Sequence, residues 1–243
     1  MVQLLCRGYQ CNSFELIKAH IVPGGFARDT MEQHPHNLKI SLDGVRPTQH
    51  GVYDSEILCK DCDGELGKLD DYALDVCRRF PREHVAIGDG TFEMDNIDGD
   101  RFAKFVLSVL WRASITSRPE FQKVSLGLYE ASACEVIFGA KPLSRMPSYE
   151  LLVGRYSQTG KFNPERNYTT PARFKIAGLD GWGLALHGFR VMAKIDLAPL
   201  PAEIGPAIVN GNTKLIGAFV PYEATTEGRS VIAMARAEWE RSR

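Results

Sequence analysis

The stretch LCKDCDGELGKLDDYALDVCRRF, residues 58–80, joins two cysteines to a helical pattern of apolar side chains. The apolar residues recur at spacings of three or four, at Leu66, Leu69, Ala73 and Val76. This periodicity predicts an amphipathic helix that begins near Cys62 and ends near Phe80. Its opposite face carries acidic residues, so the two cysteines mark the start of a helix with one apolar face.

Four of the six cysteines form two close pairs along the chain. Cys6 and Cys11 have four residues between them, and Cys59 and Cys62 have two. Two such turns can direct four thiolates at one point, which gives the tetrahedral sulfur site that zinc accepts. Because we find no signal peptide, metal binding is a better interpretation of this spacing than disulfides. We therefore predict a structural zinc; the alternative is four reduced cysteines without a metal.

Two further helices are predicted after a connector at residues 81–100, which would contain one or two short strands. DGDRFAKFVLSVLWRAS, residues 98–114, carries one apolar stripe and has Asp100 as a candidate N-cap. LYEASACEVIFG, residues 128–139, predicts a shorter helix that Gly139 ends. From residue 148 the chain becomes rich in β-formers separated by turn residues, and Leu179–Gly181 resembles a hairpin loop.

These patterns together predict an α+β fold with two parts. Residues 1–80 would form a zinc-bound finger made of short strands, loops and one helix. Residues 81–243 would form an α+β domain with helices at about 99–140 and antiparallel strands at about 148–220. A C-terminal helix, SVIAMARAEWERSR, would close the chain.

Charge and hydropathy exclude some classes of partner. The net charge is −1, which implies no overall attraction to nucleic acid or anionic lipid. No window approaches the roughly 18 uninterrupted apolar residues of a membrane span, so we expect a cytoplasmic protein without a membrane partner.

One basic segment, GRYSQTGKFNPERNYTTPARFK at residues 154–175, interleaves cations with aromatic residues. Its cations are Arg155, Lys161, Arg166, Arg173 and Lys175. This composition is suited to contacting phosphates and stacking bases, so we predict contact with nucleic acid here. The alternative is a set of strands with one buried face.

The order of the motifs resembles the treble-clef finger of HNH-type endonucleases. The resemblance depends on the first cysteine pair, AHIVP at residues 19–23 and LCKDCD at residues 58–63. It is closest to an uncharacterised branch of bacterial and phage proteins in which a His-Ile-x-Pro segment precedes Leu-Cys-x-x-Cys and an acidic residue. SVLWRA, residues 108–113, is a weaker similarity beyond the finger.

This resemblance implies a ββα-metal site. His20 would be the general base that activates water to attack a phosphodiester, and Asp63 would hold magnesium or manganese through an oxygen atom. The chain departs from the family at Ala19, where a side chain that helps to hold the metal or orient the base is usual. Further candidate ligands are Asp70, His34, His36 and Asp54.

Three hypotheses follow from these observations. The first is a metal-dependent phosphodiesterase or endonuclease that acts on nucleic acid, with DNA favoured over RNA. The second is a catalytically degenerate zinc module that binds a protein or nucleic acid. The third is a phage–host defence or counter-defence protein that binds a partner enzyme. An open site with further ligands around His20 would favour catalysis, whereas a ring packed against apolar side chains would favour the second hypothesis.

Overall fold

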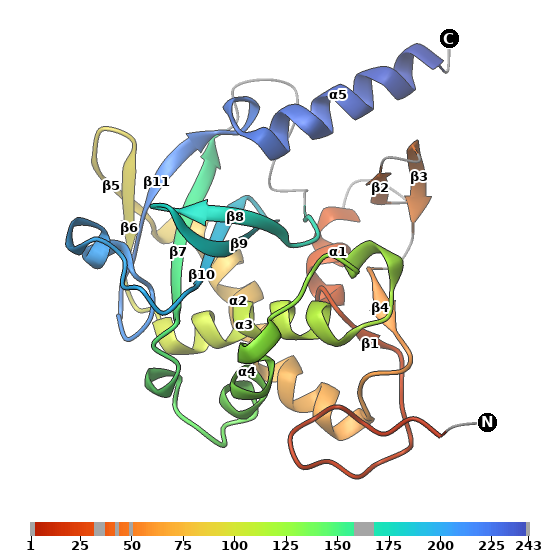
Figure 1. The fold of residues 1–243 in the computed structure, drawn as a ribbon. Coiled ribbons are helices and arrows are strands. Elements are labelled where there is room, and N and C mark those ends of the chain that lie inside the picture. Colours follow the sequence, from red (N-terminus) through yellow and green to blue (C-terminus); the bar gives the residue numbers. More distant parts are fainter. Residues whose placement is uncertain (1–2, 32–36, 42–43, 49–50, 158–167, 242–243) are drawn as a thin grey trace.

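The computed structural model describes residues 3–31, 37–41, 44–48, 51–157 and 168–241 of the chain (Figure 1). Within these ranges the fold is a mixture of helices and a mostly antiparallel sheet, as the sequence predicts. No helix in the described ranges has both the length and the apolar character needed to cross a membrane.

The first part of the chain forms two small antiparallel pairs of strands. Strands β1 (Ala19–His20) and β4 (Tyr53–Asp54) pair with each other, as do β2 (Asn37–Ser41) and β3 (Gly44–Thr48). Helix α1 (Gly24–Met31) begins where the sequence predicts only a turn. Its formation is explained by burial, because Phe26 and Ala27 lie in the core.

Helix α2 (Lys60–Glu83) confirms the helix predicted from the cysteine-rich stretch. It begins directly after Cys59 and continues slightly beyond the predicted end, to where the backbone N–H of His84 donates to the Phe80 carbonyl at 3.2 Å. The predicted apolar face is buried at Leu66, Ala73 and Val76. This face packs on helix α3 (Gly99–Ile115).

Helix α3 has a different N-cap from the one predicted. The Asp98 carboxylate accepts a hydrogen bond from the backbone N–H of Arg101 at 2.9 Å, so Asp98 is the cap. Asp100 lies inside the first turn and accepts a hydrogen bond from the Gly211 backbone at 2.7 Å. Helix α4 (Glu130–Ile137) ends as predicted, with Gly139 in a left-handed conformation at φ 77°.

A sheet of seven strands forms the second layer of the fold. The strands lie in the order β5-β6-β11-β7-β10-β9-β8. Their bounds are β5 (Val85–Gly88), β6 (Thr91–Met94), β7 (Tyr149–Ser157), β8 (Ala172–Ile176), β9 (Leu179–Leu186), β10 (Phe189–Ile195) and β11 (Leu215–Pro221). Short 3-10 helices lie at Pro119–Phe121, Gly127–Tyr129, Leu143–Arg145, Ala202–Ala207 and Tyr222–Ala224.

The sheet differs from the prediction in one respect. Strand β11 pairs in parallel with β7, whereas a wholly antiparallel sheet was expected. Residues 196–214 connect β10 to β11 past β7, so β11 enters between β6 and β7 and runs antiparallel to β10. Strands β5 and β6 lie in the connector for which the sequence predicts one or two short strands, and they join the sheet beside β11.

The hairpin between β8 and β9 turns two residues earlier than predicted. Ala177 and Gly178 adopt φ values of 51° and 85°, which are the left-handed conformations of a tight hairpin turn. Leu179 and Asp180 therefore belong to β9, where Asp180 lies opposite Lys175 of β8.

A single large hydrophobic cluster includes residues from both predicted parts. Phe80 of α2 packs edge-on against Phe92 and Phe189 of the sheet, with ring centroids 4.9 Å apart in each case. The boundary predicted near residue 80 thus lies within a continuous core, on a helix that contacts both parts. Helix α5 (Thr226–Arg241) is the predicted C-terminal helix, and it extends past the sheet toward β2 and β3 (Figure 1).

Candidate functional site

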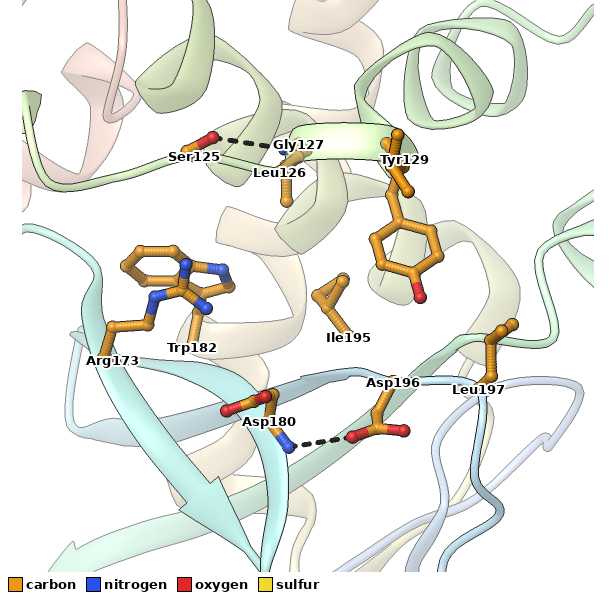
Figure 2. Close-up of a pocket in the computed structure, with 11 residues that line it drawn as sticks. Ser125, Leu126, Gly127, Tyr129, Arg173, Asp180, Trp182, Ile195, Asp196 and Leu197 are labelled. Atoms are coloured by element: carbon orange, nitrogen blue, oxygen red, sulfur yellow. Dashed lines mark hydrogen bonds between the residues drawn. The ribbon is translucent and has the colours of Figure 1, made fainter.

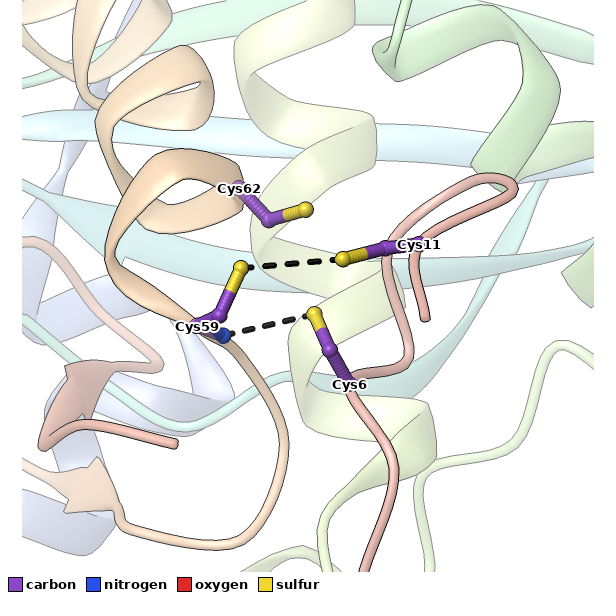
Figure 3. Close-up of side chains that lie close together, drawn as sticks. All are labelled: Cys6, Cys11, Cys59 and Cys62. Carbon is purple, nitrogen blue, oxygen red and sulfur yellow. Dashed lines mark hydrogen bonds between the residues drawn. The ribbon is translucent and has the colours of Figure 1, made fainter. Parts of the chain in front are cut away.

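The four paired cysteines converge at the start of α2 (Figure 3). The Sγ atoms of Cys6, Cys11, Cys59 and Cys62 all lie within 4.8 Å of one another. The Cys11 and Cys59 sulfurs are 3.7 Å apart. The edge of a tetrahedron with zinc–sulfur bonds of about 2.3 Å is about 3.8 Å, so this separation fits a shared zinc.

Backbone contacts build the two cysteine turns. The N–H groups of Gly8 and Cys59 both point at the Cys6 sulfur, at 3.4 Å and 3.3 Å. A backbone hydrogen bond also joins the segment after Cys11 to the second cysteine turn, because the Ile17 N–H donates to the Leu58 carbonyl at 2.9 Å. These N–H groups stabilise negative charge on sulfur, as a thiolate ligand requires.

The acid–base properties of the cysteines also favour a cation at this point. Burial raises the pKa of the Cys59 thiol, but hydrogen bonds from the Cys62 backbone and the neighbouring thiols outweigh it and lower the pKa to about 7. The pKa of Cys62 is raised by burial and by the other thiols. The site thus favours one thiolate, but repulsion between neighbouring sulfurs disfavours further thiolates. A bound cation removes this repulsion.

The cluster can therefore hold a metal ion such as zinc. The remaining cysteines lie outside it, as the sequence predicts. Cys77 is buried in the core, where burial raises its pKa to about 12. The Cys134 sulfur lies 3.8 Å from the Arg7 carbonyl oxygen rather than among the four ligand atoms.

His20 lies at the end of β1, directly opposite Tyr53 of β4. The two rings meet edge to face, with centroids 6.3 Å apart. The backbones of two glycines lie close to the half-buried imidazole. A Cβ atom at Gly24 would lie 3.1 Å from His20 Nε2, and one at Gly51 would lie 3.4 Å from Cδ2. The ring is therefore flanked by backbone and Tyr53 rather than enclosed by large aliphatic side chains at these positions.

Asp63 of α2 is electrostatically coupled to His20. Burial lowers the pKa of His20; the Asp63 carboxylate opposes that shift, and Arg112 adds to it. Burial also favours the neutral form of Asp63, which raises the pKa of its carboxyl group. The helix therefore brings the carboxylate that follows Cys62 into the electrostatic surroundings of the predicted base.

The other candidate ligands are placed elsewhere or lie outside the described residues. Asp54 stands on β4 opposite Ala19, and strand alternation places both side chains on the face away from His20 and Tyr53. The Asp54 carboxylate accepts hydrogen bonds from the Glu56 backbone at 2.8 Å and from the Thr116 hydroxyl.

His34 and His36 fall outside the described residues. Among the residues that are described, the four cysteines are the one group of three or more Cys, His, Asp or Glu ligands that converge. Neither His20 nor Asp63 therefore belongs to a group of three such converging ligands among the residues that the structure describes.

Asp70 is engaged by Arg112 of α3, a residue that the sequence reasoning did not select. Arg112 is buried and pairs with Asp70 at 2.7 Å and 3.0 Å. Its Nη1 atom also donates to the His20 carbonyl at 2.9 Å. In the sequence, Arg112 belongs only to the SVLWRA segment that resembles the nuclease family. That segment does not indicate which residues the arginine contacts.

The described cations of the predicted nucleic-acid segment do not lie on one shared basic surface. Arg155 is only 4% exposed, and its guanidinium lies over the rings of Phe80 and Phe189 at 4.8 Å and 4.9 Å. The aromatic neighbours of Arg155 thus pack around its cation within the core, where the sequence pattern predicted that they would stack on bases. Lys161 and Arg166 lie outside the described residues.

The remaining two cations are exposed, and Arg173 lines a cleft of about 380 Å³ (Figure 2). Arg173 stacks on Trp182 at 4.5 Å, and Lys175 pairs with Asp180 at 2.7 Å. Asp180 and Asp196 line the same cleft, so acidic groups stand close to Arg173. The cleft therefore has mixed charge rather than the uniform positive charge of a phosphate-binding groove.

Comparison with known proteins adds no assignment: no protein-family model matches the chain, and neither a curated protein nor a solved structure is significantly similar to it.

Proposed function

We propose that this chain is an HNH-like, zinc-containing protein that acts on nucleic acid as a metal-dependent phosphodiesterase or endonuclease. The carrying observation is the antiparallel pair of β1 and β4 followed by α2, with His20 and Asp63 electrostatically coupled beside the cysteine cluster. In this proposal the cysteine turns and α2 form a treble-clef finger in the cytoplasm, and DNA is favoured over RNA as the substrate.

His20 would act as the general base. Burial lowers its pKa, so the imidazole is neutral near pH 7 and can accept a proton from water. Gly24 and Gly51 lie against the ring and add no side chain beside it. The residue's backbone is also fixed, because the carbonyl of His20 accepts a hydrogen bond from Arg112.

Asp63 would provide an oxygen ligand for magnesium or manganese. Magnesium is often held by one or two carboxylates, with waters and substrate phosphates completing its coordination, so a single protein carboxylate is compatible with it. Such a cation, when bound, neutralises charge on the phosphate and on the leaving oxygen.

The test is cleavage of plasmid DNA, single-stranded DNA and RNA with magnesium, with manganese and with chelator. His20→Ala and Asp63→Ala should each reduce metal-dependent cleavage by at least about 100-fold, within the usual contribution of a general base or metal site. Asp71→Ala is the matched control, since Asp71 is exposed on the same helix. Absence of metal-dependent cleavage, or equal rates for wild type and His20→Ala, would contradict the proposal.

A second candidate is a non-catalytic zinc module that binds a protein or nucleic acid, with phage–host defence or counter-defence as one setting. It is favoured by the lack of a third converging Cys, His, Asp or Glu ligand near His20 among the described residues. It is also favoured by Ala19, which is fully buried and has no ligand atom. Binding of DNA, RNA or a co-purified protein that is unchanged in His20→Ala, without any cleavage, would support this candidate.

A further inference from the structure

The buried guanidinium of Arg112 has an acceptor for each of its N–H groups. Nε donates to the Ser108 carbonyl at 3.3 Å, and Nη2 donates to the Ser108 hydroxyl at 3.1 Å and to Asp70 Oδ1 at 2.7 Å. Nη1 donates to Asp70 Oδ2 at 3.0 Å and to the His20 carbonyl at 2.9 Å. Since arginine has five N–H donors, these five contacts fix the plane and the rotation of the group.

These contacts join three elements that are distant in sequence. Arg112 and Ser108 belong to α3, Asp70 to α2 and His20 to β1. The Arg112 side chain is 1% exposed and that of Asp70 is 14% exposed, so water screens the pair weakly. A buried arginine in such a fork has one favoured geometry, and the strand that carries His20 is held to that geometry.

We propose that Arg112 is a positioning residue that holds the His20 end of β1 against α2 and α3. The candidate site would then be completed by the part of the chain after residue 80, rather than by the cysteine finger alone. The catalytic consequence rests on the proposed function, but the positioning itself can be measured without any activity.

A lysine at position 112 cannot replace this contact set. Its ammonium has three donors at a single atom and lacks the planar fork, so it cannot pair with both Asp70 oxygens and still reach the Ser108 and His20 acceptors in the same geometry. Arg112→Lys keeps the positive charge and should loosen His20. Arg79→Lys is the matched control, because Arg79 makes ion pairs with Asp75 and Glu83 within α2.

The experiment records the NMR signals of the histidine rings in full-length, zinc-loaded protein. The six histidines can be resolved by selective labelling, and the His20 signal is assigned by its loss in His20→Ala. Arg112→Lys should shift the His20 signal, with the His84 signal and the zinc content unchanged. Asp70→Asn is a second variant, which keeps the side-chain size and should move the same His20 signal. Arg79→Lys should leave the His20 signal in place.

Three outcomes would overturn the proposal. The His20 signal could stay unchanged in both Arg112→Lys and Asp70→Asn, or all histidine signals could shift together. Loss of the folded state in both variants would show that Arg112 supports the whole fold instead of positioning one strand.

Activity gives an independent readout. If the wild type cleaves nucleic acid, Arg112→Lys should lower kcat by roughly 10- to 100-fold with a smaller change in KM, as expected when a base is slightly misplaced. An unchanged kcat would overturn the positioning role in catalysis. If the wild type cleaves nothing, the proposed function fails, and the His20 signals still decide whether Arg112 positions this strand.

Discussion

Replacing Gly8 by alanine tests whether the four cysteines hold a metal together. A Cβ atom at position 8 would lie 2.3 Å from the Cys62 sulfur and 3.0 Å from Cys62 Cβ. Non-bonded heavy atoms are comfortable at about 3.5–4.0 Å, so the sulfur or the turn must move by roughly 1 Å or more. A free cysteine can rotate away, whereas a metal-bound cysteine can move only by leaving its position among the ligands.

The magnitude follows from sharing the binding free energy among four ligands. Structural zinc in small fingers contributes about 10–16 kcal/mol, so one ligand corresponds to about 3 kcal/mol. Gly8→Ala should therefore weaken zinc binding by about 100-fold. It should also lower the thermal stability of the zinc-loaded protein, because metal binding is coupled to folding.

The assay is competition for zinc against a chromophoric chelator, with zinc content measured on the purified protein. Gly67→Ala is the control, since this glycine lies within α2 and an added Cβ would meet nothing within 4 Å. The control should bind zinc like the wild type and be more stable by about 0.5–1 kcal/mol. Equal zinc affinity for Gly8→Ala and the wild type would refute a tetrahedral site built on this turn.

Three further predictions use other parts of the fold. Asp29 accepts hydrogen bonds from Arg78, which lower its pKa, so the stability from this pair is present above about pH 4 and is lost as the pH falls through the folded pKa. Asp29→Asn should cost about 1 kcal/mol at pH 7 in urea unfolding, and the difference should shrink as the pH falls through the folded pKa; a constant difference down to strongly acidic pH would contradict this. Cys77→Ser and Cys134→Ser should retain the wild-type zinc content by elemental analysis, and loss of zinc in either would show that the ligands are wrongly assigned. Phe80→Ala should destabilise the protein by about 3–5 kcal/mol in chemical unfolding, because the ring packs between α2 and the sheet, and a loss below about 1 kcal/mol would show that this contact is not part of the core.

Local patterns predicted the parts of this structure that depend on neighbours in sequence. The apolar periodicity of residues 66–76 gave α2, because a helical face is set by residues three and four apart. Two pairs of cysteines predicted one convergent cluster, since short turns limit where each pair of sulfurs can point. The end of α4 at Gly139 could also be predicted from the sequence, because the left-handed conformation there favours glycine.

Errors in local prediction came where two neighbouring residues satisfied the same rule. Asp98 and Asp100 both precede an apolar stripe, and either carboxylate could cap α3. The choice depends on the Gly211 backbone, which takes the Asp100 carboxylate as its acceptor. That residue lies far away in sequence, so spacing alone could not decide between the two caps.

The sequence by itself determined helices α2, α3, α4 and α5, the cysteine cluster and the place of Asp63 in the first turn of α2. Only the tertiary structure decided that β11 enters the sheet in parallel with β7, because strand pairing depends on long-range contacts. It also decided the fate of two arginines. Arg155 lies under aromatic rings, and Arg112 joins Asp70 to the His20 carbonyl. From the sequence, either arginine could be a surface cation. Only the tertiary structure shows that each is buried and which protein groups its guanidinium contacts.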